Sequence, residues 1–136
     1  AALAALGYSG RLTGLAHLNL ERNPLGERGS AVLAAAPLLG RLASLNLNGC
    51  GLGDAGVEAL VAAPGLGGLR ALALSDNDIT DRGARALAGC PSLAGLRTLE
   101  LEGNALTRAG PAILSASPYL GRLTTLNLRR NAYHHD

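Results

Sequence analysis

Glu100 and Glu102 are the residues of this sequence that most resemble a hydrolytic carboxylate pair. If they lie on one side of a strand, a rise of about 3.4 Å per residue separates them by roughly 7 Å. Paired carboxylates of glycoside hydrolases lie at such separations. A strand face open to solvent, however, places nothing apolar beside either carboxylate to make it a proton donor. We therefore expect no hydrolase site here.

Three further acids, Asp76, Asp78 and Asp81, lie in the run SDNDITD and could suggest a calcium loop. The run departs from the EF-hand pattern, since Asp81 holds the glycine position and Leu87 holds the last ligand position. We favour a capped turn, and we expect neither a metal nor a cofactor.

The two cysteines, Cys50 and Cys90, are too few for a disulfide-rich scaffold or a four-cysteine zinc site. No histidine lies near either one in the sequence pattern, so a catalytic cysteine is not expected. Their places in the pattern do not favour a disulfide between them. Two free thiols favour a reducing compartment, and we expect a cytoplasmic location.

The composition excludes several classes of function. Among 136 residues there are 30 Leu and 25 Ala but no Lys, Met, Phe or Trp, and only three Tyr. Without lysine there is no P-loop and no Schiff-base enzyme, and three tyrosines are too few to stack RNA bases. A net charge of +2 implies no strong attraction to nucleic acid or to an anionic membrane. The apolar run at 31–39 is far too short to span a bilayer.

The residues discussed so far belong to an internal repeat of 27 residues without insertions or deletions. Five segments have the pattern L-x-x-L-x-L-x-x-[N/C], and they begin at Leu15, Leu42, Leu69, Leu96 and Leu123. Three more positions repeat in the same register. The ninth holds Asn23, Cys50, Asn77, Asn104 and Asn131. A glycine recurs at Gly29, Gly56, Gly83 and Gly110, and a proline at Pro37, Pro64, Pro91 and Pro118.

Each repeat contains two kinds of hydrophobic pattern. The alternating L-x-L core predicts a short strand with its leucines on one side. Residues 53–63 and 80–89 carry small residues and leucines at helical spacing, and the proline then ends the helix. Asp54, Thr80 and Thr107 stand where an N-cap would help. The expected unit is strand, turn, helix and loop, stacked in a right-handed coil with parallel strands.

This pattern resembles the leucine-rich repeat family, and the helical form of 27 residues is similar to its ribonuclease-inhibitor-like subclass. The phrasing of segments such as LTTLNLRRN is similar to leucine-rich arrays of large bacterial genomes such as those of planctomycetes. The resemblance implies an α/β fold: a right-handed, arc-shaped solenoid with a parallel β-sheet on the concave face and helices on the convex face. It implies no particular reaction, because such repeats share an architecture.

The repeated asparagine, glycine and cysteine positions have structural interpretations. Buried amides in the ninth position satisfy backbone groups freed at the turn, in their own repeat and the next, and form a structural ladder. Cys50 fits this position as a small thiol. Cys90 takes the position before the proline that Ala36, Ala63 and Ser117 hold elsewhere, and is interpreted as a small packing residue. The glycines would let each helix lie close to the sheet.

The strand residues that point away from the leucines form the face where we expect a partner to bind, because they vary while the core positions hardly do. The third positions are His17, Ser44, Ala71, Thr98 and Thr125. The fifth are Asn19, Asn46, Ala73, Glu100 and Asn127, and the seventh are Glu21, Asn48, Ser75, Glu102 and Arg129. A face with no Trp or Tyr, roughly 20 Å across at about 4.8 Å per strand, predicts weak binding. A solvated face that binds nothing stays open as an alternative.

Other polar residues have simpler interpretations. We interpret His17 as a solvated histidine, and Arg122, Arg129 and Arg130 as a basic spot that is solvated or meets an acidic partner. The tail with His134, His135 and Asp136 is interpreted as a polar terminus.

We expect residues 1–136 to form one domain of four to five repeats, a segment of a longer array whose uncapped ends could associate with another copy. Residues 1–6 would be the tail of a preceding helix. The function that we predict is a non-catalytic protein–protein interaction module, with a partner of unknown identity. The alternatives are a structural spacer in a larger protein and an accessory module of a GTPase-activating or ubiquitin-ligase system. A designed consensus array is a further alternative.

Overall fold

The computed structural model describes residues 15–132, and its elements keep the 27-residue register of the sequence. The strands are β1 (His17–Asn19), β2 (Ser44–Asn46), β3 (Ala71–Ala73), β4 (Thr98–Glu100) and β5 (Thr125–Asn127). The α-helices are α2 (Gly26–Ala35), α3 (Gly53–Val61), α4 (Asp81–Ala88) and α5 (Ala109–Ser115). Short 3-10 helices come after three of them: η2 (Pro37–Arg41), η3 (Leu66–Gly68) and η4 (Pro91–Leu93).

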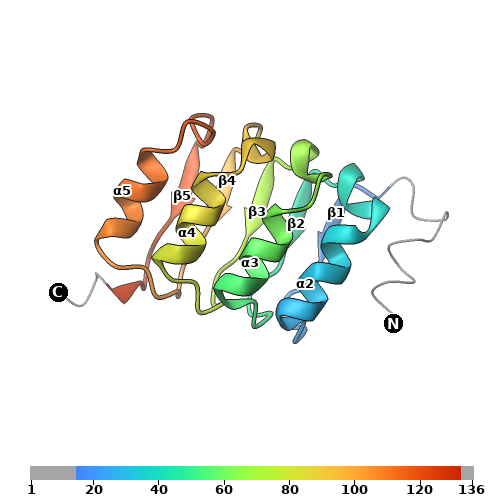
Figure 1. Cartoon of the computed structure of the whole chain (residues 1–136), viewed down its shortest axis with the longest axis horizontal. Coiled ribbons are helices and arrows are strands. Elements are labelled where there is room, and N and C mark those ends of the chain that lie inside the picture. The colour runs from blue at the N-terminus through green and yellow to red at the C-terminus, as the bar shows by residue number, and fades with distance from the viewer. Residues whose placement is uncertain (1–14, 133–136) are drawn as a thin grey trace.

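The strands form one parallel sheet in the order β1-β2-β3-β4-β5, so each strand pairs with the next one along the chain. The register matches the repeat, since Leu18 pairs with Leu45 and Leu45 pairs with Leu72. The helices lie side by side in a row over one face of the sheet (Figure 1). This is the α/β solenoid that the sequence predicts, and the other face of the sheet is left without helices.

The leucines of the repeat fill the space between sheet and helices. In the three middle repeats all nine are at most 1% exposed: Leu42, Leu45, Leu47, Leu69, Leu72, Leu74, Leu96, Leu99 and Leu101. The end repeats are less covered, and Leu126 on β5 is 38% exposed. The hydrophobic effect therefore acts mainly on the middle of the array, where each repeat has a neighbour on both sides.

The repeated proline ends each helix as predicted, but the segment after it is more regular than the loop expected from sequence. Pro37 and Pro91 open the 3-10 helices η2 and η4, where their missing N–H costs nothing. Leu38, Leu66 and Leu93 from these turns are buried in the core. No helix within residues 15–132 is long and apolar enough to cross a membrane.

The prediction that Asp54 caps its own helix is wrong. Asp54 lies within the first turn of α3, and the residue before that helix, Leu52, makes no side-chain cap. The Asp54 carboxylate instead accepts hydrogen bonds from the backbone N–H of Thr80 and of Gly83 in the next repeat. Thr80 does cap α4, by accepting from the N–H of Arg82, and Thr107 accepts from Ala109 just before α5.

The repeated glycine has a different neighbour from the one expected. A Cβ on Gly83 would lie 2.5 Å from Ile79 Cγ2 and 2.7 Å from Asp54 Oδ1. At Gly56 it would lie 2.9 Å from Leu52 Cβ. The glycine thus makes room for the residue that leads into its own helix and for the side chain of the previous helix, rather than for the sheet.

Candidate functional site

The open face of the sheet carries the three rows of residues singled out by sequence. In the third row His17 pairs with Ser44 and Thr98 pairs with Thr125 across neighbouring strands. In the fifth row Asn46 pairs with Ala73. The seventh-row residues come after the strands, at their carboxyl-terminal ends. The parallel register therefore brings the predicted residues of β1 to β5 onto one surface.

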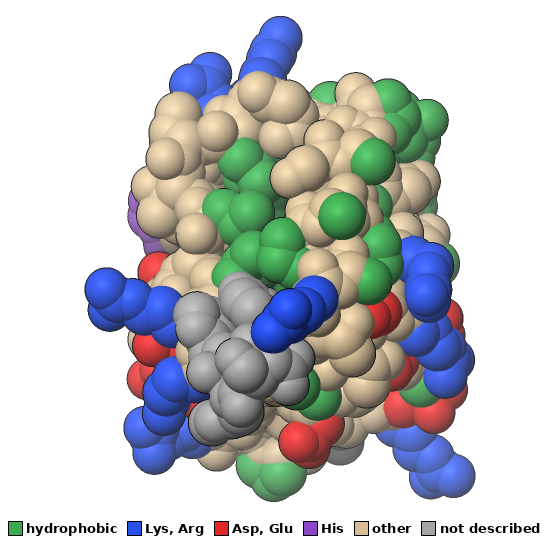
Figure 2. Space-filling view, turned by 90° about the vertical axis from the view of Figure 1, so that its left-hand side faces the viewer, with side chains coloured by type: hydrophobic (Ala, Val, Ile, Leu, Met, Phe, Trp, Pro, Cys, Tyr) green, Lys and Arg blue, Asp and Glu red, His purple; other side chains and the backbone are tan. Residues whose placement is uncertain are grey.

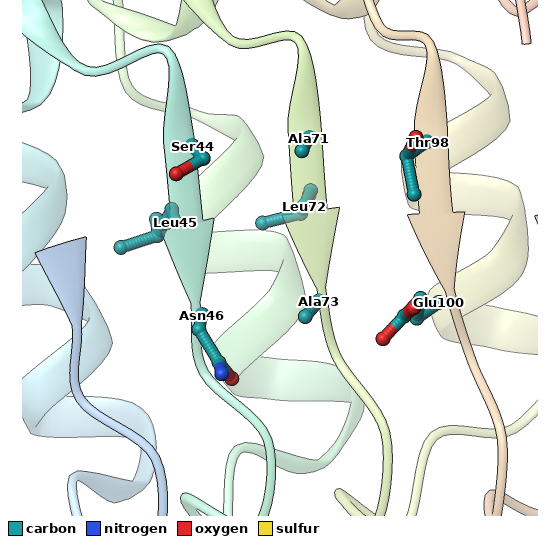
Figure 3. Close-up of a pocket in the computed structure, with 8 residues that line it drawn as sticks. All are labelled: Ser44, Leu45, Asn46, Ala71, Leu72, Ala73, Thr98 and Glu100. Carbon is teal, nitrogen blue, oxygen red and sulfur yellow. The ribbon is translucent and has the colours of Figure 1, made fainter. Parts of the chain in front are cut away.

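A shallow depression of about 170 Å³ lies in the middle of this face, across β2, β3 and β4 (Figure 3). Its lining is Ser44, Leu45, Asn46, Ala71, Leu72, Ala73, Thr98 and Glu100. It exists because β3 presents only methyl groups, at Ala71 and Ala73, between the longer side chains of its two neighbours. A small apolar group fits such a place better than a charged one.

A second hollow of about 470 Å³ lies at the carboxyl-terminal ends of the strands, and it is polar and largely acidic. Its lining is Glu21, Arg22, Asn48, Gly49, Ser75, Asp76, Glu100 and Glu102. Glu100 lines both hollows, so the two are neighbours on one face. Together they contain most of the residues that the sequence places at the centre of the face.

The row of fifth-position asparagines has a structural task as well. The side-chain oxygens of Asn19, Asn46 and Asn127 accept hydrogen bonds from the backbone N–H two residues later, at 2.9 to 3.1 Å. These bonds fix the turn at the end of three strands. Ala73 and Glu100 hold the same position and accept no such bond, so these two side chains in the middle of the row do not fix a turn.

Three further polar contacts join neighbouring repeats on the face. His17 Nδ1 lies 2.6 Å from Ser44 Oγ, so this histidine is hydrogen-bonded along its row. Asn48 Oδ1 accepts from the N–H of Ser75 at 2.8 Å, and its amide nitrogen lies 3.5 Å from a carboxylate oxygen of Glu21. The face is therefore partly pre-organised by its own side chains.

The ninth-position residues support the face from beneath. Asn77 Oδ1 accepts from the N–H of Cys50 and of Leu52, and its amide nitrogen donates to the carbonyl of Leu47 at 2.9 Å. Asn104 and Asn131 make corresponding bonds one and two repeats later. These amides tie each turn to the next repeat.

Cys50 holds one of these positions, and its thiol replaces the donor of an amide but not the acceptor. Its Sγ lies 3.1 Å from the carbonyl of Leu20, as a donor. The N–H of Asn23 turns back to Leu20 instead of finding a side-chain oxygen. Burial raises the pKa of the Cys50 thiol, which keeps the proton that this contact uses. Asn23, at the edge of the described repeats, is exposed.

The turn beside the acidic hollow uses left-handed backbone in every repeat, a feature that the sequence pattern did not lead us to predict. The eighth position has positive φ throughout: Arg22, Gly49, Asp76, Gly103 and Arg130. Gly103 matters most for the site, since a Cβ there would lie 3.4 Å from Arg130 Nη2 and would collide with Asp76. The missing side chain lets Arg130 reach Asp76 and Glu102, each at 3.6 Å. A Gly or an Asp at the eighth position was the available signal.

This places Arg130 differently from the basic spot expected from the sequence. It pairs with acids of its own chain, while Arg122 and Arg129 are not seen in an ion pair within residues 15–132. In the same part of the chain, no group of three or more His, Cys, Asp or Glu residues is arranged to hold a metal ion. His134, His135, Asp136 and residues 1–6 lie outside the described residues. The open face thus presents a small apolar depression beside an acidic hollow.

Comparisons with known proteins concern the repeats. The family described as Leucine Rich repeat matches residues 42–61 and 69–88. No curated protein matches the chain. Among solved structures, the fold is similar to the tropomodulin C-terminal domain of Caenorhabditis elegans, with a TM-score of 0.67 and 14% sequence identity. That alignment covers 93% of this chain and 79% of the tropomodulin domain, and at this identity it shows the fold alone.

Proposed function

Because the chain is a leucine-rich repeat protein, we propose that it is a non-catalytic protein-interaction module that binds its partner on the open face of the sheet. Leucine-rich repeat domains generally mediate protein–protein interaction, and the family is typically non-catalytic. The proposal places the partner over β2, β3 and β4.

The observation that carries this proposal is the contrast between the two sides of the same strands. On the buried side, the leucines of β2, β3 and β4 are identical and at most 1% exposed. On the open side, the third positions of the same three strands hold Ser44, Ala71 and Thr98, and the surface is hollowed in two places. A sheet face that only met water would gain nothing from hollows with apolar and acidic linings side by side.

The experiment is site-specific photo-crosslinking. A benzoylphenylalanine at Ala71, in the depression, should crosslink a defined protein in cells that naturally express the chain. The same residue at Ala31, exposed on α2, is the matched control on the convex side. The proposal predicts a product from position 71 that is absent from position 31. An identical product from both positions, or products from position 31 alone, would move the binding site off the sheet.

A second candidate function, a stacking segment within a longer assembly, is favoured by the end of the array. Figure 2 shows a band of hydrophobic side chains down the end where α5 and β5 lie. A hollow of about 250 Å³ there is lined by Leu114, Leu120, Leu123 and Leu126 among others. Another repeat, from the same chain or from another copy, would cover this surface.

The proposal includes the finer assignments made from sequence. The 27-residue period with α-helices supports the ribonuclease-inhibitor-like subclass, and the repeat phrasing supports a bacterial, planctomycete-type array. Two free buried cysteines support a cytoplasmic location. Nucleic acid and membrane are not among the proposed partners, because the formal net charge is only +2.

A further inference from the structure

We propose that the acidic hollow binds an arginine side chain of the partner, and that an apolar side chain of the same partner segment occupies the depression beside it. This inference rests on the proposed function and specifies the chemistry of the partner. Three observations carry it: the charge of the hollow, a nearly buried hydroxyl in its wall, and the distance between the two hollows.

The hollow has more negative charge than its own arginines neutralise. Four carboxylates line it, from Glu21, Asp76, Glu100 and Glu102, against Arg22 in the same lining. Arg130 reaches two of the four, Asp76 and Glu102. The Glu100 carboxylate makes no hydrogen bond or ion pair with any residue in 15–132, and that of Glu21 has only the long contact with Asn48. A concave site lined by unmatched carboxylates attracts a cation more strongly than a flat surface does.

Ser75 provides an independent indication of a ligand. It is 6% exposed and lines the hollow. Both of its backbone polar groups are hydrogen-bonded: the N–H donates to Asn48, and the carbonyl accepts from Asn77 and Gly49. Its hydroxyl, in contrast, has no hydrogen-bond partner among the described residues. This hydroxyl opens into the hollow and is not sealed from solvent, so a donor that enters the hollow can bond to it.

The arrangement suits arginine better than lysine or a metal ion. The open acceptors are the Ser75 hydroxyl, two residues after β3, and the carboxylate of Glu100, at the end of the neighbouring strand β4. A guanidinium carries five N–H donors in a fixed planar fork and can reach both together, whereas an ammonium is a compact point charge. A metal ion would need a cluster of three or more ligating side chains, and none is found in residues 15–132.

The distance between the hollows sets the spacing in the partner. Ala73, in the depression, and Ser75, in the acidic hollow, are two residues apart on one chain. Two residues of extended chain span about 7 Å, and their side chains point the same way. An extended partner segment lying over β3 therefore matches the face with an apolar residue and an arginine at positions i and i+2.

The probe is the peptide acetyl-Gly-Leu-Gly-Arg-Gly-amide, titrated into the whole, isotope-labelled chain and monitored by NMR. Amide shifts should concentrate at Asn48, Ala73, Ser75 and Glu102. The peptide with citrulline in place of arginine has the same shape without the charge, and it should bind about tenfold more weakly. A lysine peptide should fall between the two.

Variants of the chain test the named side chains. Glu100→Gln should weaken the arginine peptide about five- to tenfold, and Ser75→Ala about threefold, since each removes one partner of the guanidinium. Glu27→Gln removes the same charge from the exposed side of α2 and should leave the Kd unchanged. Spectra of the free variants report whether each one is folded.

The inference is overturned if the citrulline and arginine peptides bind equally, if shifts fall outside the two hollows, or if no binding is measured. These outcomes can be told apart from failure of the proposed function. A crosslinked partner at position 71 together with an inert arginine peptide rejects the arginine and keeps the binding face. Loss of both rejects the face itself.

Discussion

The carboxylate of Asp54, on α3, accepts two hydrogen bonds from Thr80: one from its hydroxyl at 2.6 Å and one from its backbone N–H at 2.8 Å. It thereby holds the residue that caps the helix of the next repeat. The arrangement recurs 27 residues later, where Asp81 accepts from the hydroxyl and the N–H of Thr107. These pairs bind neighbouring repeats together on the convex side, as the buried asparagines do beside the sheet.

Loss of the Asp54 carboxylate should therefore weaken the contact between repeats. We expect Asp54→Ala to lower the free energy of unfolding by about 1–3 kcal/mol, because three donors lose a charged acceptor. Urea unfolding monitored by circular dichroism measures the change. Glu27→Ala is the matched control, since Glu27 holds the same repeat position on α2 and has no side-chain hydrogen bond among residues 15–132. Equal losses in both variants would contradict this role.

The repeated glycine gives a second stability prediction. Gly83→Ala should lower the free energy of unfolding by about 1–3 kcal/mol, because the new methyl group would overlap Ile79 and the Asp54 carboxylate. Gly67→Ala, where a Cβ meets nothing within 4 Å, should be neutral or slightly stabilising. Thermal unfolding of the two variants side by side measures the difference. If Gly83→Ala leaves the free energy of unfolding unchanged, Ile79 and Asp54 can move away from the new methyl group without a cost in stability.

The thiol in the asparagine ladder predicts a stabilising substitution. Cys50→Asn supplies a side-chain oxygen to the N–H of Asn23, which now turns back to the Leu20 carbonyl at 3.2 Å, in the way that Asn77 serves Cys50. We expect a gain of about 1 kcal/mol, the usual net value of a hydrogen bond. Cys50→Ala, which loses the contact with the Leu20 carbonyl, should be destabilised instead. Chemical unfolding of the three proteins ranks them, and an asparagine variant less stable than the alanine variant would show that this position does not accept an amide.

The ion pair of Glu58 with Arg82 gives a pH prediction. The hydrogen bond from Arg82 lowers the pKa of the Glu58 carboxyl below its ordinary value. A group with a lowered folded pKa stabilises the fold above its unfolded pKa, near 4.3 for glutamate, and loses that contribution as the pH falls through the folded value. Arg82→Ala should therefore raise the pKa of Glu58 in an NMR titration and remove this acid-side dependence. Because both side chains are exposed, the change in stability should be small.

The strands, the helices, their ends at proline and the solenoid could be predicted from the sequence, because the same pattern recurs in every 27-residue repeat. The sequence could not predict contacts that depend on the distance between repeats. Asp54 looked like the cap of its own helix, and only the stacking of α3 on α4 shows that it holds Thr80. Ser75 looked like any other face residue, and nothing in the repeat pattern indicated that it is only 6% exposed.

Obstruction of the depression most directly tests the claim that the open sheet face binds protein. The affinity for the partner identified by crosslinking can be measured by calorimetry for Ala71→Tyr and for Ala31→Tyr. A tyrosine at position 71 fills the space above β3 without a change of charge, while position 31 is exposed on the convex α2. We predict that Ala71→Tyr weakens binding at least about tenfold, or about 1.4 kcal/mol, with Ala31→Tyr unchanged. Unchanged affinity in the folded Ala71→Tyr variant would show that the partner does not bind on this face.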